Sequence, residues 1–353
     1  MSTWFGITTT CDRVTTVDLS NNNLLGPIPS EIGNLSLLTS LKLNDNTFSG
    51  SIPSSIGNLA NLTDLVLSTS KITGSLPPEI GNLTQLIYFY AENNQLSGSV
   101  PSSIENLKSL QQISLYNNQM TGSLESLCAL DQITYINFAN NQFTGSLPEG
   151  ITSLINLQTL YLANNQLSGT VPIRVDKLVN VQNFELRNNK FTGPISDNFS
   201  FMISLNYLAL DNNMLTGSLP VDLGSGLSES GIPPDPLVQL YLQNNQFTGS
   251  IPYLGGLTAL QDFQFYNNQL TGNFPGLQLC TSLQTVIGSN NNLSGTIPDI
   301  YIQLPLLTYF DFGNNWLTGA LPPSLSNCTL LTDLKLNDNQ LSGTIPDLSL
   351  IHI

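Results

Sequence analysis

The sequence predicts a solenoid of α/β-type repeats, with one curved parallel β-sheet on its concave face and short 3₁₀ or irregular segments on its convex side. Three observations predict this fold. A 24-residue unit recurs about 14 times from Cys11 onwards. Nearly every unit carries apolar residues two apart, such as Leu41 and Leu43, which is typical of a short strand with one buried face. Fixed polar, Gly and Pro positions follow, so the strands stack at a constant interval.

Each fixed position has a physical role. Position 12 is Asn in every unit except one, where Ser70 replaces it, and a buried amide there can bond neighbouring turns as a ladder. Position 16 is Gly in every unit, as expected where the backbone needs a positive φ. Proline follows three residues later in most units and prevents a long return helix. We therefore expect residues 11–347 to form the repeat domain, with an insertion at 224–235.

The repeat L-x-x-L-x-x-L-x-L-x-x-N-x-L-[ST]-G-x-[IL]-P resembles the plant-type extracellular leucine-rich repeat. The run Trp4-Phe5-Gly6-Ile7 before Cys11 also resembles the end of that family's N-terminal cap. In the family, the cap cysteine pairs with another just upstream, and that partner is missing here. The resemblance implies that residues 1–10 are the remnant of a cap and that this chain is a fragment of a longer protein.

Residues 348–353 depart from the repeat. They can be interpreted as a divergent end of the last unit or as translated sequencing-adapter DNA, and the sequence leaves both interpretations open. No polar capping unit follows in either case, although solenoids normally need one for solubility.

Composition argues against several functional classes. The formal net charge is −15, and 9 basic against 24 acidic residues leave no cationic face for a nucleic acid. The one histidine, His352, is second from the end, which argues against histidine-based catalysis. Cys280 and Cys328 lie two units apart, roughly 10 Å at ~4.8 Å per strand, beyond the ~7 Å reach of a disulfide. We expect them to be small buried hydrophobic residues, and we expect no catalytic residue, metal or cofactor in this chain.

No apolar run approaches the ~18 residues that a membrane helix needs. No span is expected here, although a full-length receptor could be membrane-anchored. Glycosylation sequons are compatible with secretion but are about as frequent as chance predicts, so an extracellular or cell-surface location rests on the resemblance. The possible N-glycosylation sites are Asn34, Asn61, Asn82, Asn198, Asn292 and Asn327.

The exposed face of the strands is the candidate binding surface. Positions 6, 8, 10 and 11 of each unit should point outward. They hold nine of the 11 tyrosines, and ten acidic against three basic residues. The other two tyrosines, Tyr253 and Tyr301, are expected on the convex side. The candidate ligand-binding residues are Tyr88, Tyr90, Glu92, Tyr116, Tyr135, Tyr161, Glu185, Arg187, Tyr207, Asp211, Tyr241, Asp262, Tyr266 and Tyr309.

Two explanations account for these tyrosines. Tyrosine suits a pleated surface and stabilises neighbouring strands. It also offers a large, rigid contact area with a polar tip, which favours a binding role. The negative charge of the face favours cationic or neutral ligands.

The leading interpretation is a non-catalytic recognition module, similar to the ectodomains of leucine-rich-repeat receptor-like proteins and receptor kinases. Its partner would be a peptide, a glycan or a protein on the concave face, and any kinase domain would lie beyond this chain. Two alternatives remain. One is a secreted inhibitor of cell-wall-degrading enzymes, like the polygalacturonase inhibitors, which are shorter solenoids. The other is an adhesion or ice-binding repeat protein.

Overall fold

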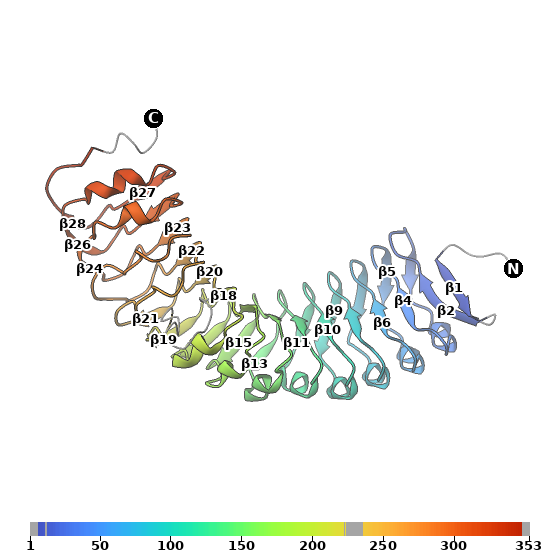
Figure 1. Ribbon diagram of the computed structural model, residues 1–353. Helices are drawn as coiled ribbons and strands as arrows, with labels where there is room; N and C mark the ends of the chain where they lie inside the picture. The colour runs from blue at the N-terminus through green and yellow to red at the C-terminus, as the bar shows by residue number, and fades with distance from the viewer. Residues whose placement is uncertain (1–5, 11–12, 222, 224–235, 348–353) are drawn as a thin grey trace. The chain divides into compact units, whose positions relative to one another are not determined.

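The computed structural model describes residues 6–10, 13–221, 223 and 236–347 (Figure 1). The chain forms two compact units, Met1–Ser168 and Gly169–Ile353, and each is considered by itself. The expected insertion at 224–235, the segment 348–353 and Cys11 lie outside the described residues. The expected domain boundaries therefore stay predictions.

The first unit is built on a sheet with one strand per repeat. Its strands, in spatial order, are β1 (Ile7–Thr10), β2 (Arg13–Asp18), β4 (Ser40–Lys42), β6 (Asp64–Val66), β8 (Tyr88–Tyr90), β10 (Gln112–Ser114), β12 (Tyr135–Asn137) and β14 (Thr159–Tyr161). Strand β1 is antiparallel to β2, and the later pairs are parallel with equal positions side by side. Leu41 pairs with Leu65, which pairs with Phe89. All three are fully buried, so the register places the repeated leucines in one core.

The second unit repeats this arrangement. Its strands are β16 (Asn183–Glu185), β18 (Tyr207–Ala209), β20 (Gln239–Tyr241), β22 (Asp262–Gln264), β23 (Thr285–Ile287), β25 (Tyr309–Asp311) and β27 (Asp333–Lys335), all parallel. Aromatic residues replace several core leucines here. The rings of Phe263 and Phe265 lie 4.5 Å apart, and those of Phe310 and Phe312 lie 4.8 Å apart. Such ring pairs add to the free energy gained from burial.

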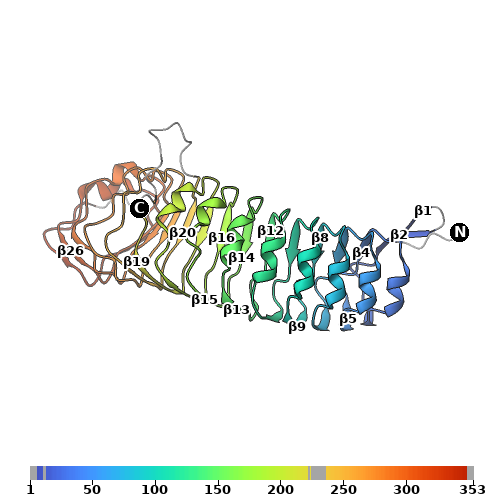
Figure 2. The ribbon, with the colours of Figure 1, turned by 90° about the horizontal axis from the view of Figure 1, so that it is seen from below.

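Short 3₁₀ helices carry the return segments, as predicted. They are η1 (Ser30–Asn34), η2 (Ser54–Asn58), η3 (Pro78–Asn82), η4 (Ser102–Asn106), η5 (Glu125–Ala129) and η6 (Glu149–Ser153) in the first unit, and η7 (Val175–Lys177), η8 (Asp197–Phe201), η10 (Tyr301–Gln303) and η11 (Pro323–Asn327) in the second. Figure 2 shows those of the first unit as a row of coils. The repeated proline precedes most of them, as at Pro53 with φ of −69°. No α-helix occurs among the described residues.

A second set of short strands follows the ladder position, and the sequence pattern did not predict it. These strands are β3 (Leu25–Pro27), β5 (Thr47–Gly50), β7 (Lys71–Gly74), β9 (Gln95–Ser99), β11 (Gln119–Thr121), β13 (Thr144–Ser146), β15 (Gln166–Gly169), β17 (Lys190–Gly193), β19 (Met214–Ser218), β21 (Gln246–Thr248), β24 (Ser294–Thr296), β26 (Trp316–Gly319) and β28 (Gln340–Leu341). Glycine normally weakens a strand. Here the repeated glycine has a positive φ, as at Gly50 with 73°, so the strands are short.

The predicted amide ladder is present. Asn165 accepts a hydrogen bond from the Phe143 amide at 3.0 Å and donates to the carbonyls of Phe138, Leu162 and Ala163 at 3.0–3.2 Å. The same pattern recurs at other position-12 asparagines, and it links each repeat to the one before. At Ser70 the hydroxyl is buried without a hydrogen-bond partner, so the ladder is interrupted there.

Position 11 forms a second row of amides. Its residues have φ of 53–56° in every described repeat, a region that Asn and Asp tolerate better than other side chains. Several of these asparagines bond to one another, as where Asn267 donates to Asn244 at 2.6 Å and Asn290 donates to Asn267 at 2.8 Å. The unusual member is Thr69, because a β-branched residue is strained at positive φ.

Candidate ligand-binding surface

The predicted tyrosines lie on the outer side of the long-sheet strands, which we call the sheet face and which carries positions 6, 8 and 10. Each of these nine side chains is half-buried: Tyr88, Tyr90, Tyr116, Tyr135, Tyr161, Tyr207, Tyr241, Tyr266 and Tyr309. Their backbones are fixed by parallel pairing, so their order along the face follows the order of the repeats.

In the first unit, tyrosines form two ring pairs. Tyr88 and Tyr90 stack along β8 with centroids 6.3 Å apart. Tyr135 and Tyr161, on adjacent strands, meet edge to face at 6.2 Å. The Tyr90 hydroxyl donates to Oε1 of Gln112 on the next strand. Burial, followed by the charge of Glu92, raises the pKa of Tyr90, so this hydroxyl stays protonated near neutral pH.

Glu92 continues the same row at position 10. One of its carboxylate oxygens, Oε2, is buried without a hydrogen-bond partner. An unpaired buried acceptor carries a free-energy cost. The described residues of the first unit form no ion pair. The carboxylate of Glu92 therefore adds negative charge to the sheet face without a cationic partner.

In the second unit, Arg187 is held in a network of charges and rings. Its Nε–H donates to Oδ1 of Asp211 at 3.1 Å, and Nε lies 3.7 Å from Oε1 of Glu185. Its guanidinium carbon lies 5.3 Å from the ring centroid of Tyr241, a cation–π distance. Ala209 stands between Glu185 and Tyr241 in the strand register. Because that residue is small, Arg187 can reach across β18.

Tyrosine hydroxyls complete this network. Tyr207 donates to Oε1 of Glu185 at 3.2 Å, and Tyr241 donates to Oδ2 of Asp262 at 2.7 Å. The Tyr207 and Tyr241 rings meet edge to face at 5.8 Å. Gln264 also donates to both oxygens of Asp262 at 3.0 and 3.2 Å. The sequence indicated the tyrosines and acids but not their pairing, because partners come from different repeats.

Burial dominates the electrostatics of the two acids around Arg187. Desolvation raises the pKa of Glu185 despite the nearby Arg187 charge and the Tyr207 hydrogen bond. Desolvation also raises the pKa of Asp211, and it outweighs the opposing effect of Arg187. Burial likewise raises the pKa of Tyr207 and of Tyr241 above the ordinary value, so both hydroxyls act as donors.

The structure separates direct contact residues from supporting ones. Asp211 is only 1% exposed, so we assign it to holding Arg187 rather than to touching a ligand.

At the C-terminal end of the second unit, Lys335 lies 4.7 Å from the Tyr309 ring centroid and donates to the Tyr309 hydroxyl.

Tyr301 lies on a convex return segment, as expected, but its side chain is 0% exposed and packs edge to face against Phe310 at 5.5 Å. It fills the position that Ile80 and Leu325, both buried, fill in other repeats. Tyr253, in contrast, is 54% exposed as expected.

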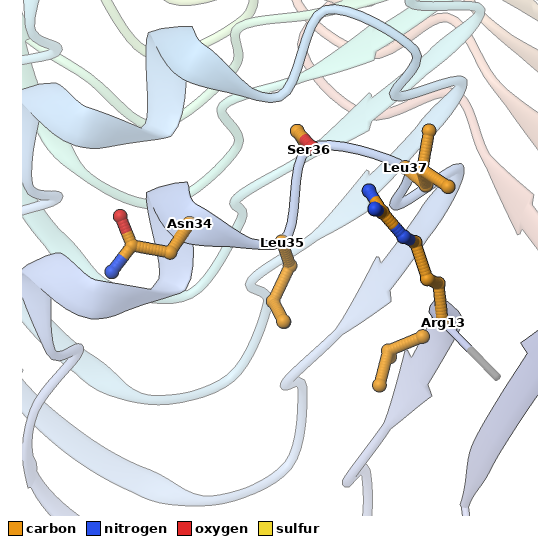
Figure 3. A pocket seen from close by; sticks show the side chains of 6 residues that line it. Arg13, Asn34, Leu35, Ser36 and Leu37 are labelled. Carbon is orange, nitrogen blue, oxygen red and sulfur yellow. The ribbon is translucent and has the colours of Figure 1, made fainter.

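One shallow pocket of about 230 Å³ lies in the first unit but not on the tyrosine-bearing strands. It is lined by Arg13, Val14, Asn34, Leu35, Ser36 and Leu37. Figure 3 shows the Arg13 side chain beside Leu37, with Asn34 on the neighbouring 3₁₀ turn. None of the candidate tyrosines lines this pocket.

The cysteines are consistent with a structural role. Cys280 and Cys328 are 0% exposed, which confirms that they are buried. Burial raises the pKa of Cys280 to about 12 and that of Cys328 to about 11. Within the described part of the chain, no cluster of metal-ligating side chains occurs. No helix in that part is both long and apolar enough to cross a bilayer.

Comparison with solved structures reveals close architectural relatives. A plant peptide hormone receptor, RGFR1, in complex with RGF2 matches with a TM-score of 0.87 and 33% identity, over 94% of this chain and 52% of that one. The Arabidopsis receptor kinase HAESA, in complex with the peptide hormone IDA and the co-receptor SERK1, matches with a TM-score of 0.87 and 34% identity. This match covers 94% of this chain and 55% of that one. A third match is the ectodomain of the Arabidopsis thaliana membrane receptor kinase GASSHO1/SCHENGEN3, in complex with CASPARIAN STRIP INTEGRITY FACTOR 2. Its TM-score is 0.80 and its identity 33%, over 95% of this chain and 42% of that one.

The chain thus spans about half the length of these receptors. No curated protein sequence matches it. Two family models match, described as a leucine-rich repeat region over residues 13–123 and a leucine-rich repeat at 132–154, 156–178, 236–257 and 306–328. Together with the ladder, the parallel sheets and the 3₁₀ returns, these matches show that the chain belongs to the leucine-rich repeat family.

Proposed function

We propose that this chain is the ligand-recognition part of a cell-surface leucine-rich-repeat receptor, and that its sheet face binds an extended peptide. The observation that carries the proposal is the concentration of half-buried tyrosines on the sheet face of both units, two of which bond acidic side chains in the second unit. Half-buried tyrosines keep rigid, amphipathic area available for contact at low entropy cost.

The similar structures support the peptide class. RGFR1 is in complex with RGF2, and HAESA is in complex with the peptide hormone IDA. A recognition role for this chain requires no catalytic group, and half-buried tyrosines on several strands suit a ligand that crosses those strands. The proposed location is extracellular, with any kinase domain in a part of the protein beyond this chain.

The experiment uses a peptide selected from a plant extracellular peptide library against the purified chain. Replacing Tyr135 and Tyr161 by Ala together removes the edge-to-face pair in the first unit. We expect the double variant to bind the selected peptide more weakly, with a loss of about 2 kcal/mol or more in binding free energy if the two rings are binding anchors. Isothermal titration calorimetry measures the loss, and circular dichroism checks that the fold is kept.

Tyr253→Ala is the matched control, because Tyr253 is exposed but lies outside the strand positions of the sheet face. Tyr301 cannot serve as a control, since truncating a fully buried ring would destabilise the core. Equal losses of affinity from the Tyr253 variant and from the Tyr135/Tyr161 double variant would contradict the proposal.

A further inference from the structure

Trp316 is an exposed aromatic side chain that the sheet face does not explain. It stands at position 13, the first residue of β26, where Gln is the commonest residue in the other repeats. It is 60% exposed, more than Tyr253 at 54% and Phe201 at 47%, the other two exposed aromatic residues described in the second unit. An exposed indole surface of this size is a cost in water unless something covers it.

The residue row beside Trp316 carries a glycosylation sequon. Asn292, Leu293 and Ser294 form the N-x-S pattern, and Asn292 occupies position 13 of the preceding repeat. In the parallel pairing of β24 with β26, Ser294 is the register partner of Trp316. The Trp316 amide donates to the Leu293 carbonyl at 2.8 Å, which fixes the two segments side by side.

Strand geometry then places Asn292 diagonally beside Trp316. Asn292 lies two residues before β24 (Ser294–Thr296), and its amide and that of Ser294 donate to the Leu270 and Gly272 carbonyls of the preceding repeat. The backbone is therefore extended through Asn292, and with Leu293 buried between them, Asn292 and Ser294 share the side on which Trp316 lies. Diagonal neighbours are within reach of an aromatic side chain. Asn292 is exposed, and within the described part of the chain no residue hydrogen-bonds its side-chain amide.

We propose that Asn292 carries an N-linked glycan and that the Trp316 indole packs against its first sugar. The C–H face of a pyranose is apolar, so stacking removes it and the indole from water while the sugar hydroxyls stay solvated. This proposal rests on the proposed extracellular function, because the glycan is added only in the secretory pathway.

Three other sequons in the described residues differ from this arrangement. The Asn61 side-chain amide donates to the Ser36 carbonyl at 2.9 Å, and that of Asn327 donates to the Ser324 carbonyl at 2.9 Å. Asn34 is exposed but borders a pocket with no aromatic lining residue. Among these four sequons, Asn292 is the one that combines an exposed side chain with an exposed aromatic neighbour.

Tryptophan fluorescence can follow Trp316 specifically, because the chain contains only 2 tryptophans, Trp4 and Trp316. The chain is secreted from insect cells with Trp4→Phe, so that Trp316 reports alone. Glycopeptide mass spectrometry measures occupancy at Asn292. We expect occupancy, together with a blue shift of Trp316 emission and weaker acrylamide quenching than in the Asn292→Gln variant.

Two further variants separate stacking from mere attachment. Trp316→Gln restores the commonest residue of this row; it should keep the glycan but release it faster to a peptide N-glycosidase. Asn34→Gln removes a sequon from the first unit and should leave Trp316 emission unchanged. An unoccupied Asn292 in the secreted chain, or emission identical with and without its glycan, would overturn the proposal.

These outcomes are distinct from failure of the proposed function. Peptide affinity at the sheet face should be the same in Asn292→Gln as in the parent chain. Loss of glycan stacking with intact peptide binding rejects only the glycan site. Normal stacking with no effect of the Tyr135/Tyr161 double variant on peptide affinity rejects only the peptide surface.

Discussion

At the scale of single residues, the position-12 asparagine is the main polar link between repeats. One amide serves three carbonyls and one amide N–H, and those backbone groups come from two neighbouring turns. No other side chain offers a donor pair and an acceptor at that length with so little bulk. A buried amide that is fully bonded is therefore compatible with a leucine core.

Replacing Asn165 by Ala should destabilise the fold by about 1–3 kcal/mol, because the Phe143 amide and the carbonyls beneath it lose their partner. Urea denaturation followed by circular dichroism measures the change. The neighbouring Gln166→Ala is the control, since Gln166 is exposed and its bond to Phe143 is made by the backbone. An equal shift for both variants would contradict the role of the ladder.

The gap at Ser70 predicts the opposite effect. An asparagine there is expected to accept from the Phe48 amide and to donate to the carbonyls of Leu43, Leu67 and Ser68, by equivalence with the bonds of Asn94 one repeat later. Ser70→Asn should raise the free energy of unfolding by about 1 kcal/mol. Differential scanning calorimetry measures it, and a lowered Tm would show that the gap does not accommodate an amide.

At the scale of strands, register decides which charges meet. Arg187, Asp211 and Glu185 belong to two adjacent repeats, and Ala209 leaves room for the guanidinium to reach Tyr241 on a third. Buried ion pairs of this kind fix geometry more than they stabilise, since desolvation offsets much of the attraction. The raised pKa of Asp211 and of Glu185 follows from that balance.

This balance predicts a pH dependence. Because burial raises the pKa of Asp211 in the folded state above its ordinary value of 3.8, folding favours its protonated form. The stability of the parent chain relative to Asp211→Asn should therefore rise as pH falls from 7 towards 4, and this gain should be lost as pH rises through the folded pKa. Urea denaturation across that range tests it, and a relative stability that falls with acidification would contradict it.

At the scale of the whole molecule, each repeat is stabilised mainly by its neighbours, so stability is distributed along the chain rather than centred in one core. The formal charge of −15 is also distributed, with few ion pairs among the described residues to offset it. A cationic ligand should approach faster than an anionic one, and salt should weaken that preference.

The rate at which a partly or fully buried cysteine is alkylated should measure the local unfolding of its unit, Cys128 for the first unit and Cys280 for the second. Burial raises the pKa of Cys128 to about 11 and that of Cys280 to about 12, so little thiolate exists near neutral pH. Iodoacetamide should label both slowly in the native chain and rapidly in urea, with Cys280 the slower because it is fully buried. Peptide mass spectrometry measures the rates. Native labelling of Cys280 as fast as that of a free thiol would contradict its burial.

The repeat, the strand positions, the Asn ladder and the glycine backbone could be predicted from the sequence, because they depend on local residue types that recur at a constant period. The sequence also placed the tyrosines on one face, since alternation along a strand is a local property. The pairing of Arg187 with Asp211 and of Tyr241 with Asp262 depends instead on contacts between repeats. No single repeat contains that information.

Tertiary structure alone decided burial and diagonal neighbours. Asp211 occupies a position that the period marks as exposed, yet packing between adjacent turns leaves it 1% exposed. Tyr301, in contrast, fills the position that Ile80 and Leu325 fill in other repeats, and it is buried as they are. The second strand set pairs position 15 of one repeat with position 13 of the next, as Ser294 does with Trp316. That offset arises because the chain advances along the solenoid as it turns. A one-dimensional alignment places Trp316 opposite Asn292, and the folded chain places it opposite the serine two residues further on.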